Sequence, residues 1–363
     1  MDLVITHPNL YLKGGAELVL LKIAQKYNAK IYTYNYRPEN TWADFKDLDV
    51  NVIKNYDMNS LFMLKTCKGF YRYKIKDNYD VINAHWSPSN WIRNRNERVV
   101  WYCHSPARAF YDLYEQRQKE YSLPVRWGHA AFADIYRSID KKINSQIEKI
   151  CCNSLNVQHR IRTYFDRESE VISPGVDLND FESLDYQRYF FYPSRITPSK
   201  RIEFAIEAFN LLNKKYPHFQ LVIAGGLQEK DRPYLEKIQK ICPTKIMINV
   251  SEEKMKELYA NCYAVLFSGM DEDFGITPLE AMASFKPIIS VNEGGPRETI
   301  IDGETGYLVN SITEMAQKMS YLIEHFDEVE RLGNNGRKRV RENYTWNIFL
   351  DKFDAALKEV SKK

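Results

Sequence analysis

The feature that most constrains the fold is an alternation of short β-rich runs with helical patterns, which stops once and then starts again. In the first series, helical patterns cover 16–27, parts of about 107–146, and 155–165. The β-rich runs of this series lie at 3–6, 29–34, 80–85, 98–104, 149–154 and 170–174. Such alternation is typical of a parallel sheet with helices on both faces.

A second series follows the same rule. Helical patterns are predicted near 198–215, 231–241 and 252–261. The β-rich runs lie at 190–195, 220–226, 245–250, 263–269, 287–291 and 306–309. A chain of 363 residues is also longer than one hydrophobic core usually supports. The sequence therefore predicts an α/β protein with two Rossmann-like domains in tandem.

The join between the series is expected near residue 175, where Pro174 and Gly175 stop the last strand and polar residues follow. We therefore predict an N-terminal domain over 1–175 and a C-terminal domain over 176–345, with a hinge between them. Beyond the second domain, 346–363 repeats apolar residues at helical spacing. This predicts a C-terminal helix, which we expect to pack back on the N-terminal domain.

The composition is that of an ordinary soluble globular protein, with 44% hydrophobic and 27% charged residues. No apolar run approaches the roughly 20 residues needed to span a bilayer, and the chain enters a strand-like run at once, without a signal peptide. These features predict a cytoplasmic location. The six cysteines show no CxxC spacing, so buried thiols are expected and neither zinc nor disulfides are indicated: Cys67, Cys103, Cys151, Cys152, Cys242 and Cys262.

The charge is distributed unevenly, because residues 1–175 carry 26 Lys and Arg against 19 Asp and Glu, whereas the remainder carries 25 against 29. Within the basic half, 54–76 holds six basic residues and one acidic, interleaved with apolar and aromatic side chains. One interpretation is peripheral contact with the anionic inner face of a membrane. The other, given equal weight, is a helix that packs its apolar stripe and solvates its lysines. Nucleic acid is not an expected partner, because the basic residues form no recognisable binding module.

In open α/β sheets, ligands bind outside the carboxyl ends of the strands. Gly14 and Gly15 lie after the first strand and before a helix, where glycines let backbone N–H groups approach a phosphate, although a plain turn is the commoner role. His104 ends a strand and would project into the cleft from a rigid support. A structural role is the alternative, and His7 and His85 occupy comparable places, so position alone does not choose among the three.

Two cations follow the first strand of the second series. Arg195 and Lys200 lie between that strand and a helix that Thr197 would cap, with Pro198 in its first turn. An Arg that donates two N–H groups and a Lys that neutralises a further oxygen suit a diphosphate. Solvated surface charges are the alternative.

A Glu-x7-Glu pattern, Glu272 to Glu280, follows the strand-like run at 263–269. Thr277 and Glu280 have the spacing of a capping box, with Pro278 at the first helical position. The N–H groups of 275–277 would then face the cleft and favour an anion, with Glu272 beside them as a hydroxyl acceptor. A metal-binding reading of Asp271-Glu-Asp273 is disfavoured, because the helix terminus and the two cations already neutralise a diphosphate.

Taken in order, these motifs resemble glycosyltransferase family 4 of the GT-B fold over essentially the whole chain. The family's fold has two Rossmann-like domains whose parallel sheets face each other across a cleft. The motifs that carry the resemblance are Gly14-Gly15, His104, Ser173–Asp177, Arg195 with Lys200, Gly225-Gly226, Glu272 to Glu280 with Phe274-Gly275, Pro287, Gly294–Glu298 and Asp302–Gly306.

The resemblance implies a role for each matched position. Arg195 and Lys200 would bind the donor diphosphate, Glu280 the ribose and Glu272 a donor-sugar hydroxyl, and His104 would meet the sugar from the N-terminal domain. The remaining donor-binding positions would be Gly14, Gly15, Gly225, Phe274, Gly275, Ile276 and Thr277. Such enzymes retain the anomeric configuration and use a nucleotide sugar as co-substrate, without a protein nucleophile or a required metal ion, so positioning and electrostatics carry catalysis.

The stretch Trp101–Arg108, with Tyr111 and Asp112 behind it, is similar to mannosyltransferases that use GDP-mannose and often act on lipid-linked glycans. Asp273 departs from the common pattern, in which proline is frequent. Three alternatives stay open: a UDP-sugar-dependent transferase, a catalytically silent subunit that binds nucleotide for a partner enzyme, and another GT-B enzyme such as an epimerase or a phosphorylase.

Overall fold

The computed structural model describes residues 1–58, 61–241 and 245–362. The chain divides into two compact units: Met1–Ser173 with Phe349–Lys363, and Pro174–Ile348. The division lies two residues before the predicted join, and most of the C-terminal helix belongs to the first unit. Within the described residues, no helix is long and apolar enough to cross a bilayer.

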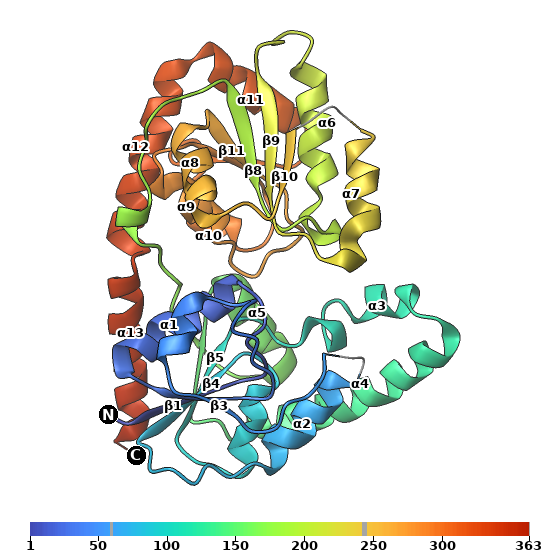
Figure 1. Cartoon of the computed structure of the whole chain (residues 1–363), viewed down its shortest axis with the longest axis vertical. Coiled ribbons are helices and arrows are strands. Elements are labelled where there is room, and N and C mark those ends of the chain that lie inside the picture. Colours follow the sequence, from blue (N-terminus) through green and yellow to red (C-terminus); the bar gives the residue numbers. More distant parts are fainter. Residues whose placement is uncertain (59–60, 242–244, 363) are drawn as a thin grey trace. The chain divides into compact units, whose positions relative to one another are not determined.

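The first unit is built on a parallel sheet (Figure 1). Its described strands are arranged in the order β3-β2-β1-β4-β5-β6-β7. They are β1 (Leu3–His7), β2 (Lys30–Thr33), β3 (Val50–Val52), β4 (Val81–His85), β5 (Val99–Cys103), β6 (Lys149–Cys152) and β7 (Glu170–Val171). The edge strand β3 was not predicted, because its three residues are exposed or half-buried and form no apolar run. The chain order reverses between the neighbours β1 and β4, and ligands of such sheets bind at this switch point.

Helices cover both faces of this sheet. They are α1 (Gly15–Tyr27), α2 (Phe62–Arg72), α3 (Tyr114–Glu120), α4 (Leu123–Asn144), α5 (Leu155–Phe165) and α13 (Trp346–Ser361), with short 3-10 helices η1 (Ala43–Asp47), η2 (Ser89–Asn94) and η3 (Arg108–Phe110). Adjacent residues of β5 lie on opposite faces of the sheet. Trp101 packs against Phe165 of α5, whereas Tyr102 packs edge-on against Phe349 and Phe353 of α13. The C-terminal helix is thus held on the first unit.

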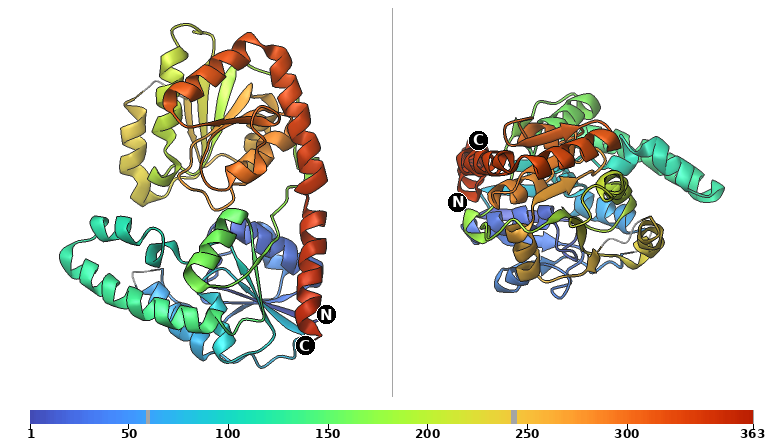
Figure 2. Two further views of the ribbon diagram at one scale, coloured as in Figure 1. Left: turned by 180° about the vertical axis from the view of Figure 1, so that it is seen from behind. Right: turned by 90° about the horizontal axis from the view of Figure 1, so that it is seen from above.

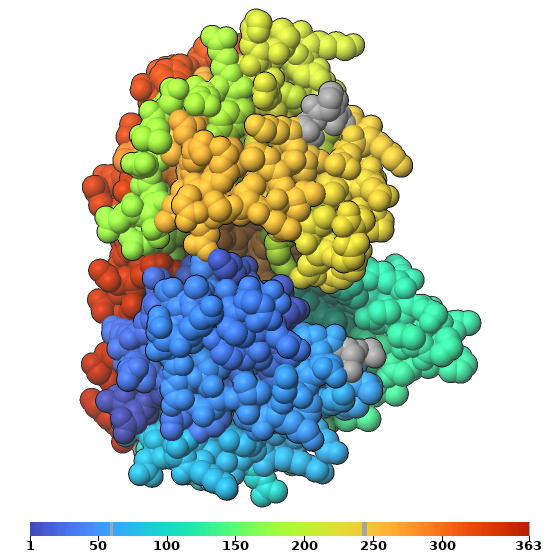
Figure 3. All heavy atoms as spheres, viewed as in Figure 1, coloured from blue at the N-terminus to red at the C-terminus, as the bar shows by residue number. Residues whose placement is uncertain are grey.

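Helices α3 and α4 form an arm that extends away from the sheet of the first unit (Figures 1 and 2). In the space-filling view this arm is a protrusion from the surface of that unit (Figure 3). Trp127, near the start of α4, is 74% exposed, an unusual state for the largest apolar side chain.

The second unit repeats the architecture with the strand order β10-β9-β8-β11-β12-β13. These described strands are β8 (Tyr189–Pro193), β9 (Gln220–Gly225), β10 (Lys245–Ile248), β11 (Ala264–Phe267), β12 (Ile288–Val291) and β13 (Gly306–Val309). The helices are α6 (Ile202–Leu212), α7 (Arg232–Gln239), α8 (Glu252–Asn261), α9 (Thr277–Ala283), α10 (Pro296–Thr299), α11 (Ile312–Glu324) and α12 (Phe326–Asn343), with 3-10 helices η4 (Leu178–Asp180), η5 (Pro198–Lys200) and η6 (Glu229–Asp231). Here the switch point lies between β8 and β11.

Alternate residues of β8 enter two separate cores. Phe190 and Tyr192 pack on the side of α6, α7 and α11, whereas Tyr189 and Phe191 pack on the side of α8 and α9. A strand with apolar residues on both faces is buried on both sides, which explains why these strands read as continuous apolar runs in the sequence.

The helix predicted at 198–215 differs from the observed structure. Residues Pro198–Lys200 form η5, Arg201 takes a left-handed backbone conformation with φ of 48°, and α6 begins only at Ile202 and ends at Leu212. Thr197 does not cap through its side chain, because its hydroxyl contacts Asp231 Oδ1 at 3.3 Å instead. The break turns Lys200 and Arg201 out of the helix and towards the loop that follows β11.

Of the six cysteines, Cys242 lies outside the described residues. The other five are buried thiols, as expected: Cys67, Cys103, Cys151, Cys152 and Cys262.

Candidate functional site

Three loops meet at the carboxyl edge of the second sheet, directly after β8, β11 and β12. Backbone hydrogen bonds join them: Met270 N–H donates to Ser199 O at 2.9 Å, and Gly295 N–H donates to Glu272 O at 2.8 Å. The three loops therefore form one connected layer at the switch point of the sheet.

Two ion pairs lie in this layer. Lys200 Nζ is 2.6 Å from Glu272 Oε1, with the two side chains 14% and 24% exposed, and Arg201 Nη2 is 2.8 Å from Glu293 Oε2. Ser268 holds both cations in place, because its hydroxyl contacts the carbonyl oxygens of Lys200 and Arg201. The residues after three adjacent strands thus bring two cations and two carboxylates together.

Arg195 is exposed at the rim of the same layer. No carboxylate in the described parts of the chain lies within ion-pair distance of its guanidinium. The loop that contains Arg195 packs closely against Gly225, since Ser194 N–H donates to Ala224 O at 3.0 Å. A Cβ at Gly225 would lie 1.8 Å from Ser194 O, so only glycine permits this approach.

Glycines also determine the path of the loop after β12. Gly294 has φ of 58°, a conformation that other residues rarely adopt. A Cβ at Gly295 would lie 2.2 Å from Phe274 O, so the two loops are in direct backbone contact there. Phe274 itself is buried, and it anchors the segment that continues through Gly275, Ile276 and Thr277 into α9.

The capping box predicted for Thr277 and Glu280 is wrong. Thr277 is the first residue of α9 rather than its cap, and Ile276, the cap, makes no side-chain hydrogen bond. Glu280 instead accepts a hydrogen bond of 2.6 Å from the hydroxyl of Tyr259 on α8. Burial raises the pKa of the Glu280 carboxyl, and the Tyr259 hydroxyl opposes that rise.

The structure gives no support to the metal-binding interpretation of Asp271 and Asp273. Within the described residues, no three His, Cys, Asp or Glu side chains are grouped closely enough to hold an ion. A metal-independent site stays a prediction.

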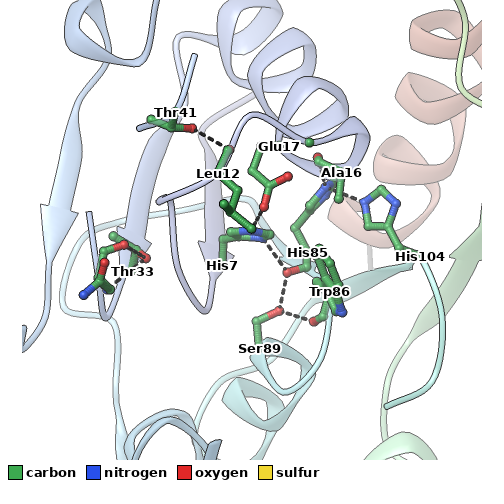
Figure 4. A network of polar contacts seen from close by, with 12 residues as sticks. His7, Leu12, Ala16, Glu17, Thr33, Thr41, His85, Trp86, Ser89 and His104 are labelled. Atoms are coloured by element: carbon green, nitrogen blue, oxygen red, sulfur yellow. Dashed lines mark hydrogen bonds and ion pairs between the residues drawn. The ribbon is translucent and has the colours of Figure 1, made fainter. Parts of the chain in front are cut away.

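At the switch point of the first sheet, three histidines converge (Figure 4). His104 Nε2 lies 2.7 Å from His85 Nε2, which also lies 3.0 Å from the carbonyl oxygen of Ala16 in α1. His7 Nδ1 contacts His85 O at 3.0 Å. The sequence had placed these three histidines in comparable positions, and the structure shows them as one cluster.

Two members of the histidine cluster, His85 and His104, are neutral. Burial, followed by the proximity of His7, lowers the pKa of His104 to about 3. Burial, followed by the proximity of His104 and then His7, holds the pKa of His85 well below its usual value. These side chains therefore act at neutral pH as hydrogen-bonding groups and not as cations.

Gly14 and Gly15 begin α1, with Gly14 as the N-terminal cap. The side chain of Glu17 folds back over this turn, so that a Cβ at Gly14 would lie 2.3 Å from Glu17 Oε2. Glu17 is buried, and its other carboxylate oxygen is 3.8 Å from His7 Nε2. The glycine turn and the histidine cluster are thus neighbours.

The expected residues fall into two groups. The residues at the carboxyl edge of the second sheet are Arg195, Lys200, Gly225, Glu272, Phe274, Gly275, Ile276, Thr277 and Glu280, and those at the edge of the first are Gly14, Gly15 and His104. Arg201 and Glu293 were not predicted from the sequence, although both follow strands of the second series. Tyr259 was not predicted either, because the sequence of a helix does not show which residue of another element a side chain contacts.

Comparisons with known proteins agree with this architecture. The model described as Glycosyltransferase Family 4 matches residues 14–180, and the model described as Glycosyl transferases group 1 matches 178–339. The chain is 22% identical to alpha-1,3/1,6-mannosyltransferase ALG2 of Dictyostelium discoideum, over 99% of this chain and 98% of that protein. It is 31% identical to a trehalose synthase of Pyrococcus horikoshii, over 68% of this chain and 65% of the relative. The structure of HepE from Anabaena in complex with UDP and glucose superposes with a TM-score of 0.76 at 17% identity, over 99% of each chain.

Proposed function

Because the chain belongs to family 4 of the GT-B glycosyltransferases, we propose that it transfers a hexose from a nucleotide sugar to a glycan or lipid-linked acceptor, with retention of configuration. Mannose from GDP-mannose is the preferred donor. This choice is supported by similarity to a mannosyltransferase along the whole chain and by the stretch Trp101–Arg108.

The observation that carries the proposal is the cluster of cations and carboxylates at the switch point of the second sheet. A diphosphate placed there meets the exposed guanidinium of Arg195 and the ammonium of Lys200. Lys200 exchanges its contact with Glu272 for the phosphate oxygens, and Glu272 then accepts a hydrogen bond from a sugar hydroxyl. Glu280 binds the ribose. The glycine-lined backbone from Phe274 to Thr277 closes round the sugar and phosphate.

The reaction breaks the bond between the anomeric carbon and the phosphate oxygen and forms a bond from the same face to the acceptor oxygen. The acceptor proton passes to the departing diphosphate, so no protein base is needed. Arg195 and Lys200 stabilise the negative charge that develops on the leaving group, which is where a preorganised cation contributes most. His104 contacts the donor sugar. No metal ion takes part in this scheme.

A UDP-sugar is the second candidate donor. It is favoured by the similarity to a trehalose synthase and by the likeness to HepE, whose structure contains UDP and glucose.

A ligand screen separates these donors. A ligand that binds only the folded chain stabilises it by about 2.7 kcal/mol at a hundredfold excess over its dissociation constant. Thermal unfolding is measured with GDP, UDP, GDP-mannose and UDP-glucose, and the stabilising nucleotide is then tested for transfer, with NMR of the anomeric proton of the product. Absence of any nucleotide-dependent shift contradicts the proposal. A shift without transfer to a broad acceptor panel favours a catalytically silent subunit.

A lipid-linked acceptor requires access to a membrane, and α2 is the surface that we assign to this contact. Its buried face contains Thr66 and Phe70, whereas Lys68 and Arg72 are exposed together with Leu64, which is 47% exposed. Basic and apolar groups on one outward face suit an anionic lipid surface. The protein is then peripheral at the inner face of the membrane.

A further inference from the structure

The hydrogen bonds of the histidine cluster determine where its protons lie. A carbonyl oxygen only accepts, so the contact of 3.0 Å with Ala16 O requires a hydrogen on His85 Nε2. His104 Nε2, only 2.7 Å from the same nitrogen, must then accept from that N–H, because two N–H groups cannot face each other at this distance. One N–H shared between two acceptors is a common arrangement.

The proton of neutral His104 is consequently on Nδ1. The lone pair on its Nε2 is engaged by His85, which leaves the Nδ1–H as the donor of this ring. The orientation of the His104 ring is also set, since its centre lies 5.0 Å from the ring centre of Tyr102 and 5.9 Å from that of Trp86.

We propose that His85 is a positioning residue, which locks His104 in the Nδ1–H form and ties its ring to the first turn of α1 through Ala16. His104 then offers a directed N–H donor to an oxygen of the donor sugar, and its Nε2 does not serve as a base. The part of this inference that concerns the sugar rests on the proposed function. The proton arrangement rests on the geometry of the first unit alone.

The burial of His85 supports a functional reason for a histidine at this position. Its side chain is fully buried, and its Nδ1 has no hydrogen-bond partner among the described residues. A buried nitrogen without a partner lowers stability, so an apolar ring stacked on Tyr102 would fill the space at lower cost. The histidine contributes one thing that a phenylalanine lacks, namely the N–H that Ala16 and His104 share.

The test uses nitrogen-15 NMR of the histidine side chains in the full chain, which distinguishes the two neutral tautomers directly. In the wild type we expect His104 in the Nδ1–H form at pH 7. His85→Phe removes the donor, and we expect His104 to lose the pure Nδ1–H form. His85→Gln places an amide N–H near the position of Nε2, and we expect it to restore the wild-type tautomer in large part.

The kinetic counterpart is a fall in kcat of roughly tenfold to a hundredfold for His85→Phe, with the KM for the donor changed less than threefold, because misplacement of one contact costs about this much. His85→Gln should recover most of kcat. A wild-type His104 in the Nε2–H form overturns the inference without any variant, and so does an unchanged tautomer in His85→Phe. If no donor is turned over, the proposed function fails, while the NMR result still decides the role of His85.

Discussion

The two sheets use opposite chemistry at equivalent positions. Both units place their polar groups at the switch point of a parallel sheet, after the strands. In the second unit these groups are charged, with Lys200 paired to Glu272 and Arg201 to Glu293. In the first unit they are buried histidines, with His85 and His104 neutral and His7 joined to His85 by a hydrogen bond.

The difference indicates a division of labour. Ion pairs of partly exposed side chains can exchange partners, which suits the binding and release of a diphosphate. A buried network of neutral groups holds fixed directions, because the His85 N–H has defined acceptors in Ala16 and His104, and burial disfavours any change of charge. The second unit is therefore expected to respond to loss of charge, and the first to loss of geometry.

The largest expected effect is on catalysis, through the charged residues of the second unit. Lys200→Ala should lower kcat for donor turnover by roughly a hundredfold to a thousandfold, the range seen when one preorganised stabilising group is removed. Steady-state kinetics with the nucleotide sugar found in the ligand screen measures the change.

Lys215→Ala is the matched control, because Lys215 pairs with Glu324 on the same unit, is 65% exposed, and lies beyond the C-terminal end of α6, whereas Lys200 lies before its start. Its rate should equal that of the wild type. A kcat for Lys200→Ala within threefold of that of the control would contradict a role for Lys200 in the site.

The second prediction tests the membrane surface of α2. Reversal of charge at Lys65, Lys68 and Arg72 should weaken binding to vesicles with anionic lipid by about a hundredfold or more, since each basic residue near such a surface contributes about 1 kcal/mol. Co-sedimentation over a range of lipid concentrations measures this. The same reversal at the exposed Lys214, Lys230 and Lys240 of the second unit is the control and should have little effect. Equal loss in both triple variants would argue against a specific surface.

A smaller change is expected for Glu272→Gln. The amide still accepts a hydrogen bond but no longer carries the charge that pairs with Lys200, so kcat should fall by roughly tenfold to a hundredfold while the affinity for the bare nucleoside diphosphate is kept or increased. Isothermal titration with the diphosphate and kinetics with the sugar nucleotide separate the two. Glu324→Gln serves as control, and a loss of diphosphate affinity in Glu272→Gln would be the contrary result.

The smallest effect concerns the pH dependence of the free energy of unfolding, through His104 of the first unit. The pKa of His104 is lowered in the folded chain to about 3, from 6.5 when unfolded. Below pH 6.5 the unfolded state binds the proton first, so stability falls by up to roughly 1.4 kcal/mol for each pH unit between 6.5 and 3. His104→Asn should flatten this dependence. Urea unfolding at pH 7 and pH 5 checks it, with the exposed His218→Asn as control, and an unaltered slope would contradict the buried neutral state.

Much of the fold followed from local patterns. The strands of both units could be predicted because their signal is local: each is an apolar run bounded by glycine, proline or polar residues nearby in the chain. Strand β3 was not predicted, because its short, partly exposed run has no such signal. The helix predicted to begin at 198 begins at Ile202, because Arg201 contacts Ser268 and Glu293 from other strands and takes a left-handed conformation to do so.

By itself, the sequence determined which residue types follow each strand, and hence that Lys200, Glu272 and His104 lie at the edges of two sheets. Only the tertiary structure decided what these residues touch. It paired Lys200 with Glu272, directed Glu280 to Tyr259, and gathered His7, His85 and His104 into one cluster. The physical reason is that alternation and capping are local, whereas a contact between side chains depends on strand order, which brings β1 beside β4 and β8 beside β11.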